Sequence, residues 1–263
     1  MPVAKRKATH ARHYQDQPQA IDADGSKHWI TRAANFVADV TEAKAGARQR
    51  QDIEPETLVI VPPGASTITM PDGGEVVRVF SNKAADLTAA AANAAIYADA
   101  IAEVTPIAPW PDPVGGFGIR SYRLADFQSP DPSPLKMRVF RSTNLMINIF
   151  EPWANRRDPS KLSPHWHDDF EQMSLGLRGA FRHHLRYPWG PDMNKWEDDE
   201  HVTYEASPSI LVIPVGVIHT TQDIGEGVTW LVDIFGPPRV DFSSKPGFVL
   251  NEADYPMPKL VQA

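Results

Sequence analysis

The sequence predicts an all-β fold, a barrel or a sandwich, and three observations lead to this expectation. Proline accounts for 25 of the 263 residues, and proline is excluded from helix interiors and from central strands. Short runs of β-branched and aromatic residues recur between turn-forming residues, which is typical of sandwiches and barrels. Hydrophobic residues make up 42% of the chain, enough for a core, so a chain that is disordered throughout is excluded.

The first half is predicted to contain strands and one helix. Residues 1–24 are polar and lack periodicity, so we expect a flexible N-terminal arm there. The runs rich in β-branched and aromatic residues are His28–Val40, Leu58–Val61 and Glu75–Phe80. The alanine-rich stretch Asp86–Ala102 predicts a helix.

A segment rich in proline and glycine, residues 105–134, separates the two halves and is predicted to be a linker. Its interleaved aromatic residues, such as Trp110 and Tyr122, indicate that it wraps around another part of the protein. The second half predicts a succession of strands: Lys136–Phe140, Asn144–Phe150, Phe170–Leu177, Ala180–Tyr187, His201–Ala206, Ser209–Ile213 and Val228–Phe235. The tail that follows is again rich in proline.

Composition narrows the possible functions. The chain has no cysteine, which excludes disulfides, thiolate catalysis and iron–sulfur clusters and leaves His, Asp, Glu or backbone oxygen to hold a metal. The net charge of −7 disfavours nucleic acid as a partner. No apolar run approaches the ~20 residues that span a membrane, and no apolar stretch follows the basic N-terminal residues as in a secretory signal. We therefore expect a cytoplasmic protein with no nucleic-acid or membrane partner.

One segment has the pattern of a metal site. In an extended strand, His165, His167 and Glu171 would all point to one face, because side chains alternate along a strand. Two imidazoles and a carboxylate suit a divalent transition metal. A further histidine, His219, follows the turn at Gly216 where the next strand is predicted to begin.

These two segments resemble the two motifs of the cupin superfamily: His-x-His-x3-Glu, then Gly179, then Pro-x-Gly-x2-His about fifty residues after the first histidine. The resemblance covers roughly Lys136–Phe242, and it implies an antiparallel jelly-roll barrel with a metal inside its mouth. The leading glycine of the first motif and the asparagine that often follows the last histidine are absent. The resemblance implies four metal ligands: His165, His167, Glu171 and His219.

An internal repeat extends this interpretation to the first half. Pro62–Thr67 aligns with Pro214–His219, and the apolar runs before them fall into register. Thr67 then takes the place of His219, so the first half is predicted to be a cupin without ligands and the chain a bicupin. The predicted order is a flexible arm (1–24), a degenerate N-terminal barrel (25–104), the linker (105–134), a metal-binding C-terminal barrel (135–245) and a tail (246–263).

Candidate catalytic residues lie on the strand predicted over Ala180–Tyr187. Alternation places His183 and Tyr187 on its mostly apolar, interior face, where they could orient or protonate a substrate. The alternative is that both are core residues held by hydrogen bonds, and a bulge in the hairpin would make His184 the interior histidine instead. Glu171 is a further candidate for moving protons.

The resemblance implies a metal-dependent enzyme that acts on a small oxygenated metabolite, with isomerase (sugar- or uronate-like) or dioxygenase chemistry. Four protein ligands on an octahedral metal leave two positions for substrate or dioxygen. The expected cofactor is one divalent transition metal per chain: Fe, Mn, Ni, Co or Zn. The alternative is a non-catalytic metal- or small-molecule-binding cupin of sensor or storage type. We also expect a homodimer, because exposed strand edges favour pairing.

Overall fold

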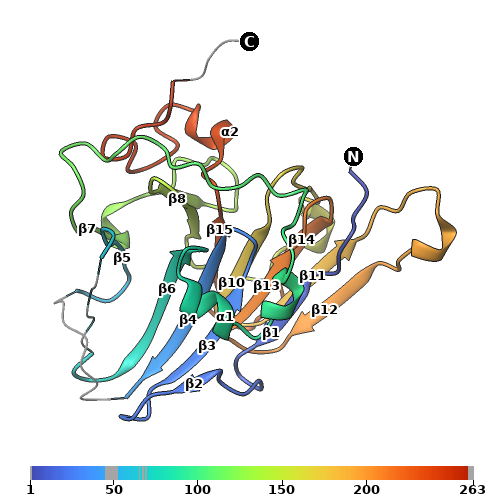
Figure 1. Cartoon of the computed structure of the whole chain (residues 1–263), viewed down its shortest axis with the longest axis horizontal. Coiled ribbons are helices and arrows are strands. Elements are labelled where there is room, and N and C mark those ends of the chain that lie inside the picture. The colour runs from blue at the N-terminus through green and yellow to red at the C-terminus, as the bar shows by residue number, and fades with distance from the viewer. Residues whose placement is uncertain (1, 45–52, 65, 67, 69, 260–263) are drawn as a thin grey trace.

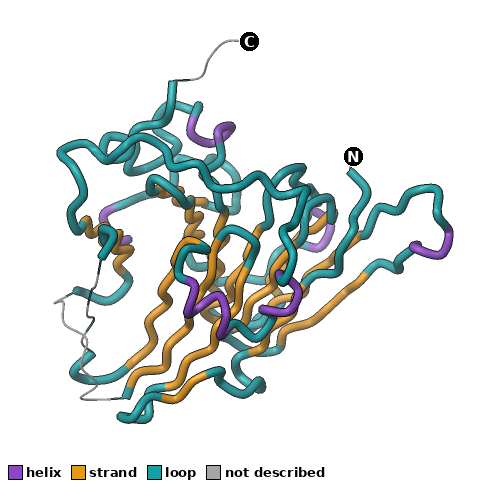
Figure 2. Tube along the Cα trace, viewed as in Figure 1, coloured by secondary structure: helices purple, strands orange, loops and turns teal. Residues whose placement is uncertain are grey.

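The computed structural model describes residues 2–44, 53–64, 66, 68 and 70–259. Strands make up most of the regular secondary structure and helices are few and short, as Figure 2 shows, which confirms the all-β prediction. The strands are β1 (Thr9–Arg12), β2 (Ala20–Ile21), β3 (Lys27–Arg32), β4 (Phe36–Ala43), β5 (Thr57–Ile60), β6 (Gly74–Ser81), β7 (Arg120–Arg123), β8 (Met137–Arg141), β9 (Met146–Phe150), β10 (Gln172–Arg178), β11 (Phe181–Arg186), β12 (Glu200–Tyr204), β13 (Ser209–Ile213), β14 (Ile218–Asp223) and β15 (Trp230–Phe235). The helical segments are α1 (Ala85–Ala90), η1 (Ala94–Tyr97), η2 (Leu124–Asp126), η3 (Pro159–Lys161), η4 (Met193–Lys195) and α2 (Val240–Ser243). In the described part of the chain, no helix has the length and apolar character needed to span a membrane.

Two sheets form the barrel of the C-terminal half (Figure 1). The larger sheet has the order β1-β13-β10-β15-β9-β8, and the smaller one the order β12-β11-β14. The segment at His165 joins the smaller sheet through a bridge to His219 in β14. From β9 to β15 the chain passes back and forth between the two sheets with antiparallel neighbours, which is the jelly-roll arrangement.

Strand β10 lies in the middle of the larger sheet, between β13 and β15. Its residues Gln172 to Gly176 are all buried, so both faces of the strand are covered. Gln172 and Ser174 face the barrel interior, where Ser174 contacts Asp233 of β15. Met173 and Leu175 point the opposite way into an apolar layer.

The N-terminal half forms a four-stranded sheet, β2-β3-β4-β6, and a two-stranded sheet, β5-β7. The four-stranded sheet packs against the outer face of the barrel's larger sheet, because residues of β4 share one core cluster with residues of β10 and β13. This layer includes Phe36, Ala38, Val40, Met173, Leu175, Ile210 and Val212. Helix α1 covers the opposite face of the four-stranded sheet, next to β3 and β4.

The aligned segments of the predicted repeat occupy different places in the two halves. β5 pairs with β7, whereas β13 pairs with β10 inside the main sheet. Only 30 residues (44–73) separate β4 from β6, while 79 residues (151–229) separate β9 from β15. The N-terminal half therefore has less chain in which to form strands. Thr67 lies outside the described residues, and the division of the chain into domains stays a prediction.

The N-terminal arm is not the flexible segment that the sequence predicts. Residues Thr9–Arg12 form β1, which pairs with β13 along the edge of the larger sheet. Ala11 is buried there, and Arg6 pairs with the buried Glu171. β1 has only four residues and its partner lies far along the chain, so it leaves no local periodicity in the sequence. The polar composition of the arm therefore wrongly predicted flexibility.

Two other predicted segments also differ in structure. The linker contributes β7, which pairs with β5. The alanine-rich stretch 86–102 is not one helix, because α1 ends at Ala90 and Ala91 is extended. The Asn93 side chain accepts a hydrogen bond from the Arg32 N–H (3.0 Å) and donates one to the Arg32 carbonyl (2.8 Å). This tertiary contact outweighs the helix propensity of alanine.

His13, just after β1, is a buried histidine. Its side chain is 5% exposed, neither ring nitrogen has a hydrogen-bond partner among the described residues, and the ring stacks on Trp29 with centroids 5.9 Å apart. Burial lowers the pKa of His13 to about 4. A histidine in an unfolded chain titrates near 6.5, so between these two values the unfolded state binds a proton that the folded state does not.

We therefore expect the free energy of unfolding to fall as the pH drops from about 6.5 to about 4. His13→Phe keeps a stacked ring and removes the titration, so this variant should lose less stability over the same range, by on the order of 3 kcal/mol. Urea unfolding at several pH values measures the difference. His201→Phe, at an exposed position on β12, is the control for replacing a histidine ring by phenylalanine. An identical slope for His13→Phe and the wild type would contradict the assignment.

Candidate metal centre

Backbone pairing brings three histidines together at the mouth of the barrel. His165 and His219 face each other across an antiparallel bridge, with N···O distances of 3.1 Å (His165 N to His219 O) and 2.8 Å (His219 N to His165 O). The N–H of Gly216 donates to the carbonyl of His167 at 2.9 Å. Gly216 has a φ of +81°, a conformation that glycine adopts without strain. The glycine of the Pro-x-Gly segment thus makes the turn that places His219 beside the other two.

The three imidazoles form one cluster. Ring centroids are 4.4 Å apart for His165 and His219, 5.1 Å for His165 and His167, and 5.2 Å for His167 and His219. One ring nitrogen from each lies within 4.8 Å of the others. His167 and His219 are buried, while His165 is exposed at the mouth.

Backbone carbonyls fix the orientation of two of these rings. Nδ1 of His165 lies 2.9 Å from the carbonyl oxygen of Ser163, and Nδ1 of His219 lies 2.9 Å from that of Val217. A carbonyl only accepts, so Nδ1 carries the proton and the lone pair of Nε2 points away from the backbone. Burial lowers the pKa of His167 to about 2 and that of His219 to about 3, so both rings are neutral, as metal ligation requires.

Gln172, which side-chain alternation from His167 does not predict, completes the cluster. Its Oε1 lies 2.9 Å from Nε2 of His167 and 3.4 Å from Nε2 of His219. The amide nitrogen donates to Oγ of Ser174 at 2.9 Å, and Ser174 donates to Oδ1 of Asp233 at 2.6 Å. This chain of hydrogen bonds holds the amide so that its oxygen faces the imidazoles.

Glu171 is not part of the cluster, so its prediction as the fourth ligand is wrong. Its carboxylate oxygens bind the guanidinium of Arg6, the N–H of Ala34 at 2.7 Å and the hydroxyl of Tyr97 at 3.1 Å. These partners belong to the N-terminal half and lie on the other side of β10. The error comes from the assumption of a continuous strand: residues 168–169 form a bend and β10 begins only at Gln172, so alternation from His167 does not carry through.

His183 in β11 and Tyr187, which directly follows β11, are both buried, but neither lines the cavity beside the cluster. His183 lies 3.0 Å from the hydroxyl of Thr221 through Nδ1, and its ring packs on Tyr204 with centroids 4.6 Å apart. Tyr187 belongs to a separate apolar cluster, and its hydroxyl accepts the N–H of Ala8 at 3.2 Å. These contacts are those of core residues, the alternative that the sequence left open.

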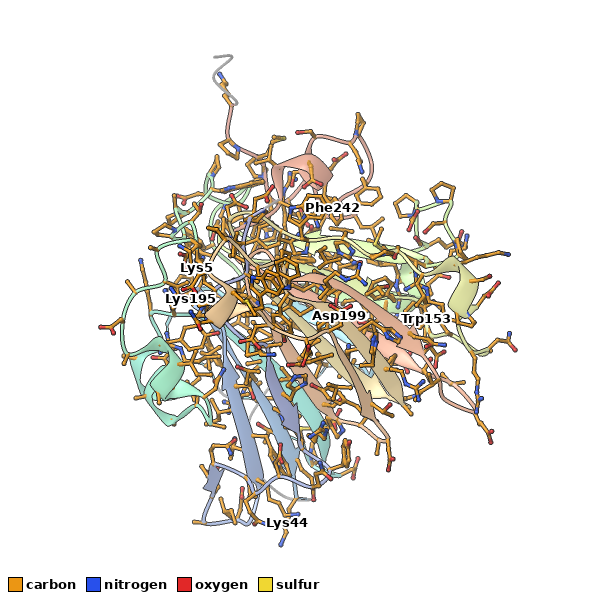
Figure 3. All side chains as sticks on the ribbon, turned by 90° about the vertical axis from the view of Figure 1, so that its right-hand side faces the viewer. Lys5, Lys44, Trp153, Lys195, Asp199 and Phe242 are labelled. Carbon is orange, nitrogen blue, oxygen red and sulfur yellow. The ribbon has the colours of Figure 1, made fainter. Side chains whose placement is uncertain are left out.

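A cavity of about 80 Å³ adjoins the cluster inside the barrel. Figure 3 labels two of its wall residues, Trp153 after β9 and Phe242 in α2. The apolar walls are Leu135, Met137, Phe150, Trp153, Leu231, Phe235 and Phe242, and the polar lining includes Asn148, Arg157, Ser163, His165, Gln172, His219, Thr220, Thr221, Asp233 and Arg239. Burial raises the pKa of Asp233 to about 7.

The donor set fits a divalent transition metal. Three imidazole nitrogens and one amide oxygen converge, and nitrogen-rich sets of this kind suit Zn, Fe, Ni, Co or Mn. The lone pair of His219 Nε2 faces Oε1 of Gln172 at 3.4 Å. Both atoms are hydrogen-bond acceptors, so no proton lies between them and the contact is unfavourable. A cation between them would turn this unfavourable contact into two ligand bonds.

Two solved structures support the fold of this chain. No family model matches the sequence, and no curated protein matches it. The structure of oxalate decarboxylase from Lactobacillus farciminis, a formate complex, is 13% identical, covers 91% of this chain and 88% of its own, and has a TM-score of 0.51. A variant of oxalate decarboxylase from B. subtilis is 11% identical, covers 96% of this chain and 84% of its own, and has a TM-score of 0.51. KdgF from Halomonas sp. is 18% identical over 44% of this chain and 94% of its own, with a TM-score of 0.33.

The chain therefore has the double-stranded β-helix fold of the cupins. Similarity to the two oxalate decarboxylase structures over nearly the whole chain is consistent with a bicupin. At these identities the likeness concerns the fold, and the chemistry has to be argued from the residues of this chain.

The two adjacent residues 171 and 172 give a direct test of the ligand set. Gln172→Ala should weaken metal binding by about tenfold or more, because it removes the oxygen that faces the imidazoles. Glu171→Gln should keep the metal and lower the free energy of unfolding by about 3 kcal/mol, because it breaks a buried ion pair. Metal content after dialysis and urea unfolding measure the two effects. Loss of metal in Glu171→Gln together with full metal in Gln172→Ala would restore the carboxylate as the ligand.

Proposed function

We propose that the protein is a metal-dependent cupin enzyme that acts on a small oxygenated metabolite. The observation that carries this proposal is the cluster of three imidazoles and one amide oxygen, of which His165, His219 and Gln172 line a cavity inside the barrel. A storage protein needs no such donor set. His165, His167, Gln172 and His219 would hold the metal, which when bound would polarise an oxygen of the substrate.

The other cavity residues have roles that follow from their chemistry. The apolar walls, such as Phe150 and Trp153, exclude bulk water and so strengthen electrostatic contacts with a bound substrate. Asn148 is 2% exposed, and its Oδ1 has no protein donor in the described structure. Because Asn148 lines the cavity, this oxygen is placed to accept a hydrogen bond from a substrate hydroxyl.

Two reaction classes would both use a metal that polarises an oxygen of the substrate. They are the isomerisation of a sugar- or uronate-like substrate and its oxidation by dioxygen. They differ in their dependence on the metal and on oxygen. Iron together with oxygen uptake supports a dioxygenase, and activity without oxygen on zinc or manganese supports an isomerase.

We also propose a homodimer, formed through exposed strand edges.

His167→Ala should abolish metal binding and leave the barrel folded, because His167 contributes a ring nitrogen to the cluster and lies in a loop between strands. Elemental analysis gives the metal content, and circular dichroism reports the fold. The matched control is His184→Ala, on the same barrel but outside the cluster, which should retain the metal. An unchanged metal content in His167→Ala, or a wild-type chain that takes up no metal, would refute the proposed function.

A further inference from the structure

Two arginines line the cavity beside the histidine cluster, in a chain whose net charge is −7. Arg239 has a carboxylate partner, because its Nε and Nη2 donate to Asp241 at 3.0 and 2.6 Å. Its guanidinium also lies over the ring of Phe242, 4.0 Å from the centroid. Its charge is therefore balanced within the protein.

Arg157 differs, because its guanidinium binds only neutral groups among the described residues. Nη1 donates to the carbonyl of Thr221 at 2.8 Å, and Nη2 donates to Oγ of Ser163 at 2.8 Å and to the carbonyl of Lys161 at 3.4 Å. Burial lowers the pKa of Arg157, and no carboxylate contributes to the shift. An arginine stays protonated in proteins, so Arg157 places an unbalanced positive charge at the cavity.

The contacts of Arg157 tie this charge to the metal centre. Ser163, whose hydroxyl accepts from Arg157, also accepts from Nδ1 of His165 through its carbonyl. Thr221, whose carbonyl accepts from Arg157, lies on β14 two residues after His219. The guanidinium is therefore held at a fixed position relative to two of the imidazoles. Of its five N–H groups, three have protein acceptors, and Nε–H and one N–H of Nη1 have none among the described residues.

We propose that Arg157 binds a carboxylate of the substrate and that the protein therefore acts on a small carboxylic acid. This inference rests on the proposed function and names its substrate class. A carboxylate can accept from one of the two N–H groups that have no protein acceptor, and a charge-assisted hydrogen bond in a partly dry cavity is stronger than one between neutral groups. The cavity of about 80 Å³ admits one small group, and a single free arginine balances one carboxylate charge.

Malonate and its neutral isostere malonamide test this inference on the full-length protein with its metal bound. Malonate should raise the melting temperature at pH 7 and malonamide should not, because ligand binding to the folded state stabilises it. Arg157→Gln should weaken malonate binding about tenfold or more, and Arg157→Lys, which keeps the charge, should recover part of it. Isothermal calorimetry gives the dissociation constants.

The neighbouring Arg156 supplies the matched control. It is exposed and pairs with Glu226 at 2.9 Å, so Arg156→Gln should bind malonate as the wild type does. The metal content of each variant is measured, so that a loss of malonate binding is not mistaken for a loss of metal.

Three results would overturn the inference: equal binding of malonate and malonamide, wild-type malonate affinity in Arg157→Gln, or tighter binding of inorganic phosphate than of malonate. If Arg157→Gln keeps its metal and still binds malonate normally, the role of Arg157 is refuted and the proposed metal-dependent function is not. A wild-type protein that holds no metal refutes the proposed function, while its response to malonate still reports on Arg157.

Discussion

Strand β10 is covered on both faces, and the alternation of its side chains decides which residues belong to the metal centre. Gln172 and Ser174 face the barrel interior, and Met173 and Leu175 enter the apolar layer against the N-terminal sheet. A shift of one residue would exchange these two sets, placing a carboxylate among the imidazoles and an amide against apolar side chains. The pairing of β10 with both β13 and β15 fixes this register.

The polar groups of the interior continue across three strands. Ser174 of β10 lies opposite Asp233 of β15, which lies opposite Asn148 of β9. All three are buried. Burying a polar group costs free energy unless the group is hydrogen-bonded. The cost of burying these three side chains therefore has to be offset by hydrogen bonds among them, by ligands bound at the site, or by both.

The sequence was informative wherever the signal was local. The strands of the C-terminal half, the turn at Gly216 and the common face of His165 and His167 follow from spacing and alternation, and the association of His219 with them follows from the resemblance to the cupin motifs. Gln172 did not, because the bend before β10 interrupts the alternation on which the choice of Glu171 depended. Arg157 carries no sequence signal, since its importance depends on which carbonyls and hydroxyls surround it. The N-terminal strand was missed for the same reason, because its partner lies in a distant part of the chain.

The position of β1 has a consequence for how the chain folds. Thr9 pairs with Val212, so about two hundred residues separate the two strands, and contacts between such distant residues slow folding because a large loop must close first. During synthesis the segment that becomes β1 emerges before β13 and has no partner until β13 has left the ribosome. Until then its backbone groups and Ala11 are accessible to other chains. This edge of the barrel is thus completed only after β13 has been made, by a segment that was synthesised about two hundred residues earlier.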